Sequence, residues 1–420
     1  MNAATIIDEV KARKLLDSRG DLTIEVEVTL TGGVGRASAP MGASRGVWEV
    51  KPYPKGGVDE AIEKVERLIS PELVGLDARD QRLVDAILHE VDGTEDFSNI
   101  GGNTAYAVSL AVADAASRAM GIPLFQHISG VIVNRLPYPL GNVIGGGKHV
   151  KGKGPDVQEF LVLPIGAENI VDAVLVNILV HRKVAEVLKR KDNHFSGGKG
   201  DEGAWATTLN SKKALKVLYD VCEEISSETE VECKPGLDIA ASTMWNSEKQ
   251  RYVYAREKIE RDIDEQFDFI TSLIEEYDLI YVEDAFHEED FESFAKLTKK
   301  FADRLICGDD LFTTNSNRLK YGIEKNACNT IIVKPNQVGT LTDTWETVKL
   351  ALKSNYIPVA SHRSGESVNA HLAHIAVAFQ CPIIKCGVVG GERISKLNEL
   401  IRIEEYLGDE AEMAEIKVKG

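Results

Sequence analysis

The segment Leu279-Ile-Tyr-Val-Glu283 is a short apolar run that ends in a charged residue. The pattern returns in Leu305-Ile-Cys-Gly-Asp309, Thr330-Ile-Ile-Val-Lys334, Ile357-Pro-Val-Ala-Ser-His362 and Ile383-Ile-Lys385, so that successive polar residues lie 26, 25, 28 and 23 positions apart. About 25 residues is the length of one strand followed by one helix. The spacing therefore predicts an α/β fold, with a parallel sheet covered by helices.

Three earlier apolar segments extend this series: Pro139–Ile144, Phe160–Leu163 and Gly236-Leu237-Asp238. Together they bring the number of strands to about eight, for which a barrel is the natural closure. We therefore expect a (β/α)8-type barrel over residues 131–420.

The first third of the chain has a different organisation. Residues Leu22–Leu30 alternate in type, with Ile24, Val26 and Val28 on one face, which predicts a strand. Helical patterns follow over Val58–Glu90 and Asn103–Met120. Since Ile128–Pro139 contains two prolines and few charges, we expect an N-terminal α+β domain over residues 1–130.

The composition is that of a globular protein, with 43% hydrophobic and 27% charged residues and a net charge of −17. Such a charge repels nucleic acid, and the chain has no basic stripe with interleaved aromatic residues. No apolar stretch is long enough to cross a bilayer, and residues 1–20 contain no apolar signal region. The six cysteines form no CxxC pair, which favours reduced thiols and a cytoplasmic location.

The polar residues at the strand ends carry the functional prediction. All strands of a parallel barrel end on one face, where the active site lies, so these six residues are expected to converge: Asp238, Glu283, Asp309, Lys334, His362 and Lys385. Three buried carboxylates repel one another unless a cation lies between them, and Mg²⁺ prefers such oxygen ligands. A lysine beside the metal would have a lowered pKa and could act as a base.

A less specific interpretation exists for each position alone. An acidic residue after one strand usually caps the next helix, and an isolated lysine is usually a surface residue. Asp284 and Asp310, which directly follow two of the acids, are interpreted as helix caps or as groups that support the ligands. The repetition of polar strand ends favours the functional interpretation for the series.

Six segments resemble motifs of the enolase family. They occur in the family's order, and the resemblance that they mark extends over most of residues 10–407. The segments are Asp17-Ser-Arg-Gly20, Val282-Glu-Asp284, Gly308-Asp-Asp-Leu311, Lys334-Pro-Asn-Gln-Val-Gly-Thr340, Ser361-His-Arg-Ser-Gly-Glu366 and Lys396-Leu-Asn-Glu-Leu-Ile-Arg-Ile-Glu-Glu405. The resemblance implies a barrel of the enolase kind and the reversible, Mg²⁺-dependent dehydration of 2-phosphoglycerate to phosphoenolpyruvate. Enolases belong to a superfamily in which a Lys or His base works with one or two Mg²⁺ ions.

The resemblance also implies roles for individual residues. Lys334 matches the base that removes the C2 proton, Glu202 the general acid, and Glu159 the partner carboxylate of that acid. Two Mg²⁺ ions are expected, with ligands at Asp238, Glu283, Asp309 and Ser44. The residues expected to bind substrate are Lys385, Arg363, Ser364, His362, His149 and Gln158. The expected partners are the phosphorylated hydroxy acid and further copies of the chain, as a dimer or octamer, but neither nucleic acid nor a membrane.

The chain departs from the family pattern around Ser44. Met41-Gly-Ala-Ser-Arg45 stands where the family usually has Ser-Gly-Ala-Ser-Thr, and the following stretch, Val47–Gly57, is several residues shorter. Pro335 and Ala285 also replace the usual residues. Two alternatives therefore stay open: a related lyase acting on another phosphorylated or polyanionic hydroxy acid, and a catalytically silent paralogue that only binds.

Overall fold

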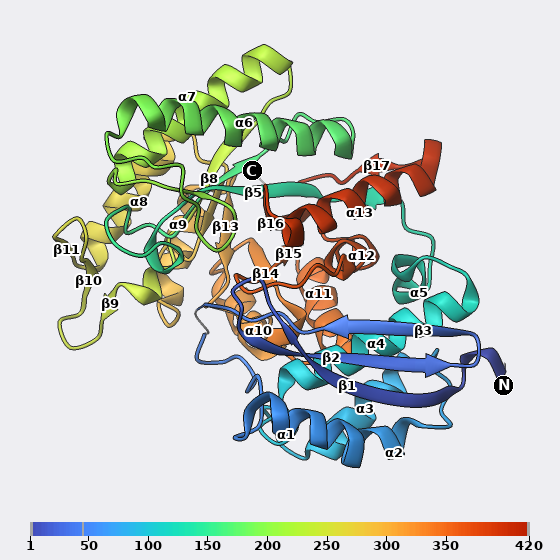
Figure 1. Ribbon diagram of the computed structural model, residues 1–420. Coiled ribbons are helices and arrows are strands. Elements are labelled where there is room, and N and C mark those ends of the chain that lie inside the picture. The colour runs from blue at the N-terminus through green and yellow to red at the C-terminus, as the bar shows by residue number, and fades with distance from the viewer. Residues whose placement is uncertain (1–2, 44–45, 418–420) are drawn as a thin grey trace.

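The N-terminal part is an antiparallel sheet packed on helices. The computed structural model describes residues 3–43 and 46–417. The sheet has the order β1 (Ile7–Leu16), β2 (Leu22–Leu30), β3 (Gly33–Ser38). As the alternation predicts, Ile24, Val26 and Val28 are buried, because this face packs on α4 (Gly102–Met120). Figure 1 shows this sheet and its helices lying to one side of the barrel.

The helical stretch expected over residues 58–90 is interrupted, which corrects the sequence prediction. The structure has α1 (Gly57–Lys64), a π-helical segment (Val65–Ile69), α2 (Ser70–Leu73) and α3 (Gln81–Asp92). Gly75 adopts a left-handed conformation with φ 92°. The Asp80 side chain caps the new helix by accepting a hydrogen bond from Leu83 N at 3.2 Å. A short helix, α5 (Leu124–Ser129), ends the N-terminal part.

Eight strands form the closed barrel that the sequence predicts. Around the barrel they are β5 (Tyr138–Gly145), β6 (Glu159–Leu163), β8 (Lys234–Asp238), β12 (Tyr281–Glu283), β13 (Leu305–Gly308), β14 (Thr330–Val333), β15 (Ile357–Ser361) and β16 (Ile383–Gly387). Pairing of β16 with β5 closes the ring. Fully buried side chains such as Leu161, Tyr281 and Ile332 form one cluster from these strands, so the interior is a packed core.

Helices cover the outside of the barrel (Figure 1). They are α6 (Ile170–Lys191), α7 (Ser211–Thr229), α8 (Ile263–Tyr277), α9 (Phe291–Lys300), α10 (Ser316–Lys325), α11 (Leu341–Lys353), α12 (His371–Ala378) and α13 (Gly391–Leu407). Short strands lie outside the ring: β7 (Trp205–Ala206) pairs with β5, β4 (Arg135–Leu136) with β17 (Glu412–Met413), and β10 (Arg251–Tyr254) with β9 (Trp245–Asn246) and β11 (Ile259–Arg261).

One barrel strand runs against the others, which corrects the expectation of an all-parallel sheet. β6 is antiparallel to both β5 and β8. The connection from β5 to β6 has no crossover helix, only a short 3-10 turn at Gly147–His149, and a parallel pair needs such a crossover. Because β6 is reversed, its first residue, Glu159, lies opposite Asp238, the last residue of β8. Glu159 therefore reaches the same rim as the ends of the parallel strands.

The two parts of the chain are joined by buried polar contacts. Asp85 of α3, which is 1% exposed, accepts hydrogen bonds from Thr342 N at 2.9 Å and Thr342 Oγ1 at 2.6 Å at the start of α11. Met41 and Gly365 exchange backbone hydrogen bonds of 2.8 Å, so the segment after β3 lies against the barrel rim. The domain division at residues 130/131 stays a prediction.

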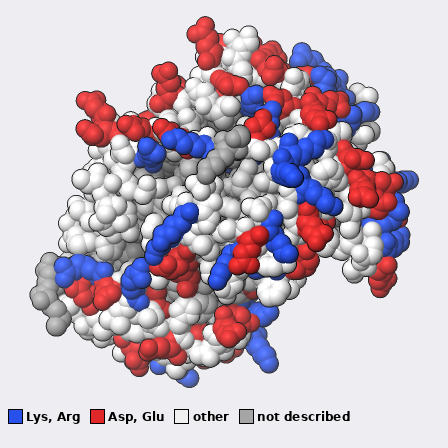
Figure 2. Space-filling model, turned by 180° about the vertical axis from the view of Figure 1, so that it is seen from behind, with Lys and Arg blue, Asp and Glu red and all other residues white. Residues whose placement is uncertain are grey.

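Acidic and basic side chains are interspersed over the face behind that of Figure 1, as Figure 2 shows. Neither sign of charge covers that face continuously. Among the described helices, none combines the length and apolar character that a bilayer span requires.

Candidate active site

A small polar pocket lies at the rim where the parallel strands end. Its lining includes five of the six residues at the strand ends: Asp238, Asp309, Lys334, His362 and Lys385. Glu283 is fully buried beneath it and contacts Lys385. The structure thus brings together six residues that are spread over nearly 150 positions of the chain.

Lys385 is the centre of the buried charges. Its Nζ lies 2.8 Å from both carboxylate oxygens of Glu283, 3.2 Å from Asp238 Oδ2 and 3.0 Å from Glu159 Oε2. The side chain is only 4% exposed. Although burial opposes the charged form, these carboxylates raise the pKa of Lys385 well above its usual value. Lys385 therefore presents a permanent positive charge to the pocket.

Lys334 follows β14 and pairs with Asp309 of the neighbouring strand. Burial would lower the pKa of Lys334, but the Asp309 carboxylate outweighs it and raises the pKa above the usual value. Its backbone N donates to Thr314 Oγ1 at 2.9 Å, which fixes the start of the 3-10 turn formed by Pro335–Gln337. From the sequence, a lowered pKa is expected for Lys334. Such a lowering requires a cation bound beside the amine.

The acidic groups of the rim suit a hard divalent cation. Among the described residues, two sets have ligand atoms within 4.8 Å of one another: His149, Glu159 and Glu202, and Asp284, Asp309 and Asp310. The predicted ligands Asp238 and Glu283 instead both accept hydrogen bonds from the Lys385 amine. Burial, together with the charge of Asp238, raises the pKa of Glu283 to about 7. Carboxylates that repel one another in this way are stabilised by a bound cation, and their oxygens are ligands that Mg²⁺ accepts.

Asp284 has a structural role beside these acids. Its two carboxylate oxygens accept hydrogen bonds of 2.9 Å from the backbone N of Asp309 and of Asp310. It therefore ties the end of β12 to the end of β13 and holds Asp309 in position. Asp284 is thus a group that supports Asp309, one of the two interpretations made from the sequence, whereas the cap of the following helix α9 is Asp290.

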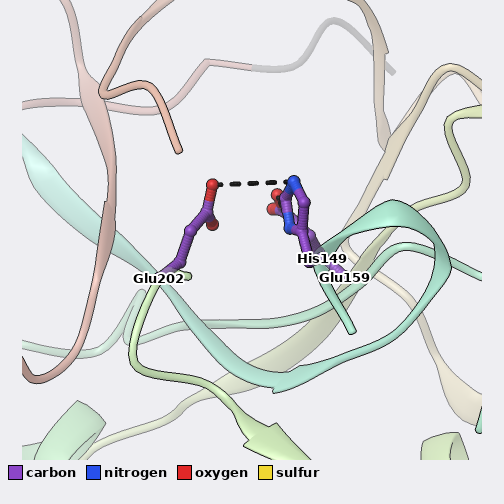
Figure 3. Close-up of side chains that lie close together, drawn as sticks. All are labelled: His149, Glu159 and Glu202. Atoms are coloured by element: carbon purple, nitrogen blue, oxygen red, sulfur yellow. Dashed lines mark ion pairs between the residues drawn. The ribbon is translucent and has the colours of Figure 1, made fainter. Parts of the chain in front are cut away.

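Glu159, Glu202 and His149 form a second buried group, shown in Figure 3. His149 Nδ1 lies 3.3 Å from Glu159 Oε1, and His149 Nε2 lies 3.8 Å from Glu202 Oε1, so each imidazole nitrogen is near a different carboxyl group. Burial and the charge of Glu202 raise the pKa of Glu159 well above its usual range. Burial would also raise the pKa of Glu202, but the nearby imidazoles of His362 and His149 hold it well below its usual range. These opposite shifts favour the protonated form of Glu159 over that of Glu202.

Arg363 and Ser364 follow β15 and face the segment that precedes α1. Arg363 Nη2 lies 3.1 Å from both carboxylate oxygens of Glu49, and Ser364 Oγ accepts a hydrogen bond of 2.6 Å from Ala43 N. Gln158 Nε2 donates to Asp238 Oδ2 at 3.3 Å. Ser44, the predicted ligand of a second metal, and Arg45 lie outside the described residues.

Three further residues shape the pocket and were not found from the sequence. Asn142 of β5 donates a hydrogen bond of 2.9 Å to Glu202 Oε2. Arg393, at 0% exposure, donates to the carbonyl oxygens of Arg363 and Ser364 at 2.6 Å each and therefore fixes that segment. Glu49 pairs with Arg363 across 314 positions of sequence. Asn142 could have been noticed as a polar residue within the apolar run of β5. No sequence pattern near Arg393 or Glu49 indicates their roles.

His181 of α6 supports the segment that carries Glu202. Its Nε2 lies 3.0 Å from the carbonyl oxygen of Gly203, and its ring stacks on Trp205 at 4.6 Å. Burial lowers the pKa of His181 to about 4, compared with ~6.5 in an unfolded chain. The unfolded state therefore binds more protons between these values, and stability is lost as the pH falls from about 6.5 toward 4.

We expect His181→Gln to reduce this acid sensitivity, because glutamine can still donate to Gly203 but does not titrate. A shift of this size corresponds to at most about 3 kcal/mol between pH 7 and pH 4. Urea unfolding at a series of pH values measures the effect, with the exposed His194→Gln as the control. If both variants show the slope of the parent chain, His181 does not contribute to the acid sensitivity.

The barrel, its rim of buried carboxylates and lysines, and the segment of the N-terminal part that lies against the rim define an α/β-barrel enzyme with an acid–base site. Family models match the chain on both sides of residue 130. The model described as "Enolase, N-terminal domain" matches residues 7–128, and "Enolase, C-terminal TIM barrel domain" matches residues 133–419.

Curated relatives agree with this match over nearly the whole chain. The chain is 53% identical to "Enolase" of Methanosphaera stadtmanae over 404 residues, which are 96% of this chain and 98% of the relative. It is 50% identical to "Enolase" of Pyrobaculum aerophilum over 418 residues, 98% of this chain and 99% of the relative. The chain belongs to the enolase family and is a carbon–oxygen lyase of that type, which confirms the resemblance described above.

Proposed function

We propose that the chain catalyses the reversible dehydration of 2-phosphoglycerate to phosphoenolpyruvate, with two Mg²⁺ ions in each active site. The observation that carries the proposal is one buried pocket with two lysines, the neighbouring carboxyl groups of Glu159 and Glu202, and the Arg363 guanidinium. We place this activity in glycolysis and gluconeogenesis, in the cytoplasm, in a homodimer or octamer. The identity to curated enolases favours it over the related-lyase and binding-only alternatives.

Magnesium held by Asp238, Glu283, Asp309 and Ser44 would bind the substrate carboxylate and stabilise the second negative charge that proton removal places on it. Lys385 adds its own positive charge next to the same carboxylate. Arg363 and Ser364 bind the phosphate, and a guanidinium is suited to this because it forms two parallel hydrogen bonds. His362 and Gln158 help to position the substrate.

Lys334, in its neutral form, takes the proton from C2 of the substrate. Hydroxide is a poor leaving group, so the C3 hydroxyl must receive a proton as its bond to carbon breaks, and it leaves as water. Glu202 donates this proton. His149 lies within reach of both carboxyl groups, and burial favours the protonated form of Glu159, so we propose that His149 passes this proton to Glu202, accepting at Nδ1 and releasing at Nε2.

Replacing Glu202 by glutamine separates the two steps. We expect Glu202→Gln to lower turnover by about 10²- to 10³-fold, the range for loss of a general acid. Exchange of the C2 proton of 2-phosphoglycerate with deuterated water is expected to continue, because Lys334 is unchanged. Ultraviolet absorbance of the enol phosphate measures turnover, and NMR measures exchange.

The parent chain with Mg²⁺ serves as the reference for both measurements. Absence of turnover by the parent chain would contradict the proposed function. Loss of exchange together with turnover in Glu202→Gln would assign Glu202 to proton removal instead of leaving-group protonation.

A further inference from the structure

Glu49 forms an ion pair with the guanidinium of Arg363. Its Oε2 lies 3.2 Å from Nη1 and 3.1 Å from Nη2, and its Oε1 lies 3.1 Å from Nη2. The two side chains are 6% and 3% exposed. A carboxylate with both oxygens on a guanidinium uses the same donors that a phosphate would use. The chain therefore places an anion of its own where the proposed function places the substrate phosphate.

Further contacts hold Glu49 in this position. Gln337 Nε2 lies 3.2 Å from Glu49 Oε1, and the backbone N of Gly46 donates to the same oxygen at 3.2 Å. The next residue, Val50, donates its backbone N to Gln337 O at 3.1 Å. The segment Gly46–Val50 is thus tied to the barrel rim through Glu49 and Val50. Val47 N and Trp48 Nε1 add hydrogen bonds of 3.3 and 3.0 Å to the side chains of Glu288 and Glu289.

The pocket is small, and Glu49 takes up part of it beside Arg363. Glu49 lines the same cavity as Lys334, Lys385 and Arg363, and the cavity volume is about 40 Å³. A volume of this size holds only a few water molecules. The phosphate can reach Arg363 only if the Glu49 carboxylate leaves.

We propose that Glu49 is an internal competitor that a phosphate dianion must displace from Arg363, and that it thereby sets both the affinity for substrate and the selection against weaker anions. This inference rests on the proposed function only in placing the phosphate at Arg363. A ligand that binds only when Glu49 has left has its affinity reduced by the fraction of molecules in that state. A phosphate dianion that accepts hydrogen bonds from both Nη1 and Nη2 displaces the Glu49 carboxylate more readily than a simple carboxylate does.

Trp48 supplies a signal for the displacement. Its Nε1 donates to Glu289 Oε1 at 3.0 Å, and its ring lies 4.8 Å from the guanidinium carbon of Arg318. Because Trp48 directly precedes Glu49 and is half exposed, movement of Glu49 changes the surroundings of the indole. Binding of phosphate is therefore expected to change the tryptophan fluorescence, and the Trp48→Phe variant should lose that change.

The test measures binding of inorganic phosphate to the whole chain by calorimetry and by fluorescence, without turnover. Glu49→Gln keeps the size of the side chain and removes its charge, so we expect phosphate to bind roughly tenfold more tightly than to the parent chain, as when an occupied site becomes free. We also expect acetate to bind detectably to this variant and not to the parent chain. The KM for 2-phosphoglycerate should fall by a similar factor. A merely structural defect would weaken binding and raise the KM, so the direction of the change distinguishes the two.

Glu289→Gln is the matched control, because it removes one negative charge from the same surface without touching Arg363. Phosphate affinity in this control should stay within about twofold of the parent. If Glu49→Gln binds phosphate no more tightly than the parent, or if Glu289→Gln gives the same gain, the inference is wrong. Phosphate binding that tightens in Glu49→Gln without turnover by the parent would contradict the proposed function and leave the inference standing.

Discussion

Lys334→Ala is expected to lower turnover of 2-phosphoglycerate by roughly 10³- to 10⁴-fold, the upper range for loss of a general base. Lys334 Nζ is the amine that contacts Asp309 at the pocket, and the Thr314 hydroxyl fixes the backbone from which it extends. The exchange of the C2 proton with solvent should fall by the same factor as turnover. This distinguishes Lys334 from Glu202, whose replacement leaves exchange in place.

Lys334→Arg separates the two roles that a lysine could have here. Arginine retains the positive charge beside Asp309 but cannot lose a proton near neutral pH. We therefore expect the arginine variant to be as inactive as the alanine variant, in both turnover and exchange. If Lys334→Arg retained most of the activity, Lys334 would act through its charge, and the base would have to be sought elsewhere in the pocket.

The positions of the main site residues could be predicted because a barrel collects them by a simple rule. Every parallel strand ends on the same face, so the recurrence of a polar residue after each apolar run locates Asp238, Glu283 and Asp309 together without knowledge of any contact. The orientation of β6 could not be predicted in this way. The side-chain pattern of a strand is the same in both directions, and only the missing crossover helix distinguishes them.

Contacts across long sequence separations had no signal in the sequence. Glu49 lies in a segment rich in glycine and proline, and nothing near it indicates that it pairs with Arg363. The same holds for Arg393, whose donors fix the backbone at Arg363 and Ser364. The break before α3 had a local cause in Gly75 and Asp80, but the apolar periodicity on both sides of it concealed the turn.

Lys385→Met is expected to destabilise the metal-free protein by about 3–5 kcal/mol, the cost of leaving buried charges without their partner. Its Nζ is the positive group shared by Asp238, Glu159 and Glu283. Methionine has a similar length and no charge, so packing changes little while three buried carboxyl groups lose their common partner. Turnover should also fall to background, because the charge next to the substrate carboxylate is lost.

Magnesium provides the decisive comparison for this variant. A divalent cation among the same carboxylates replaces much of the missing charge, and a ligand that binds only the folded state stabilises it. Millimolar Mg²⁺ should therefore raise the stability of Lys385→Met, measured by urea unfolding, by more than it raises that of the parent chain. Lys11→Met, at a site where the lysine is 58% exposed, is the control and should change stability by less than ~0.5 kcal/mol. An equal response of Lys385→Met and the parent to Mg²⁺ would mean that the cation binds away from Asp238 and Glu283, and the proposed ligand set would have to be abandoned.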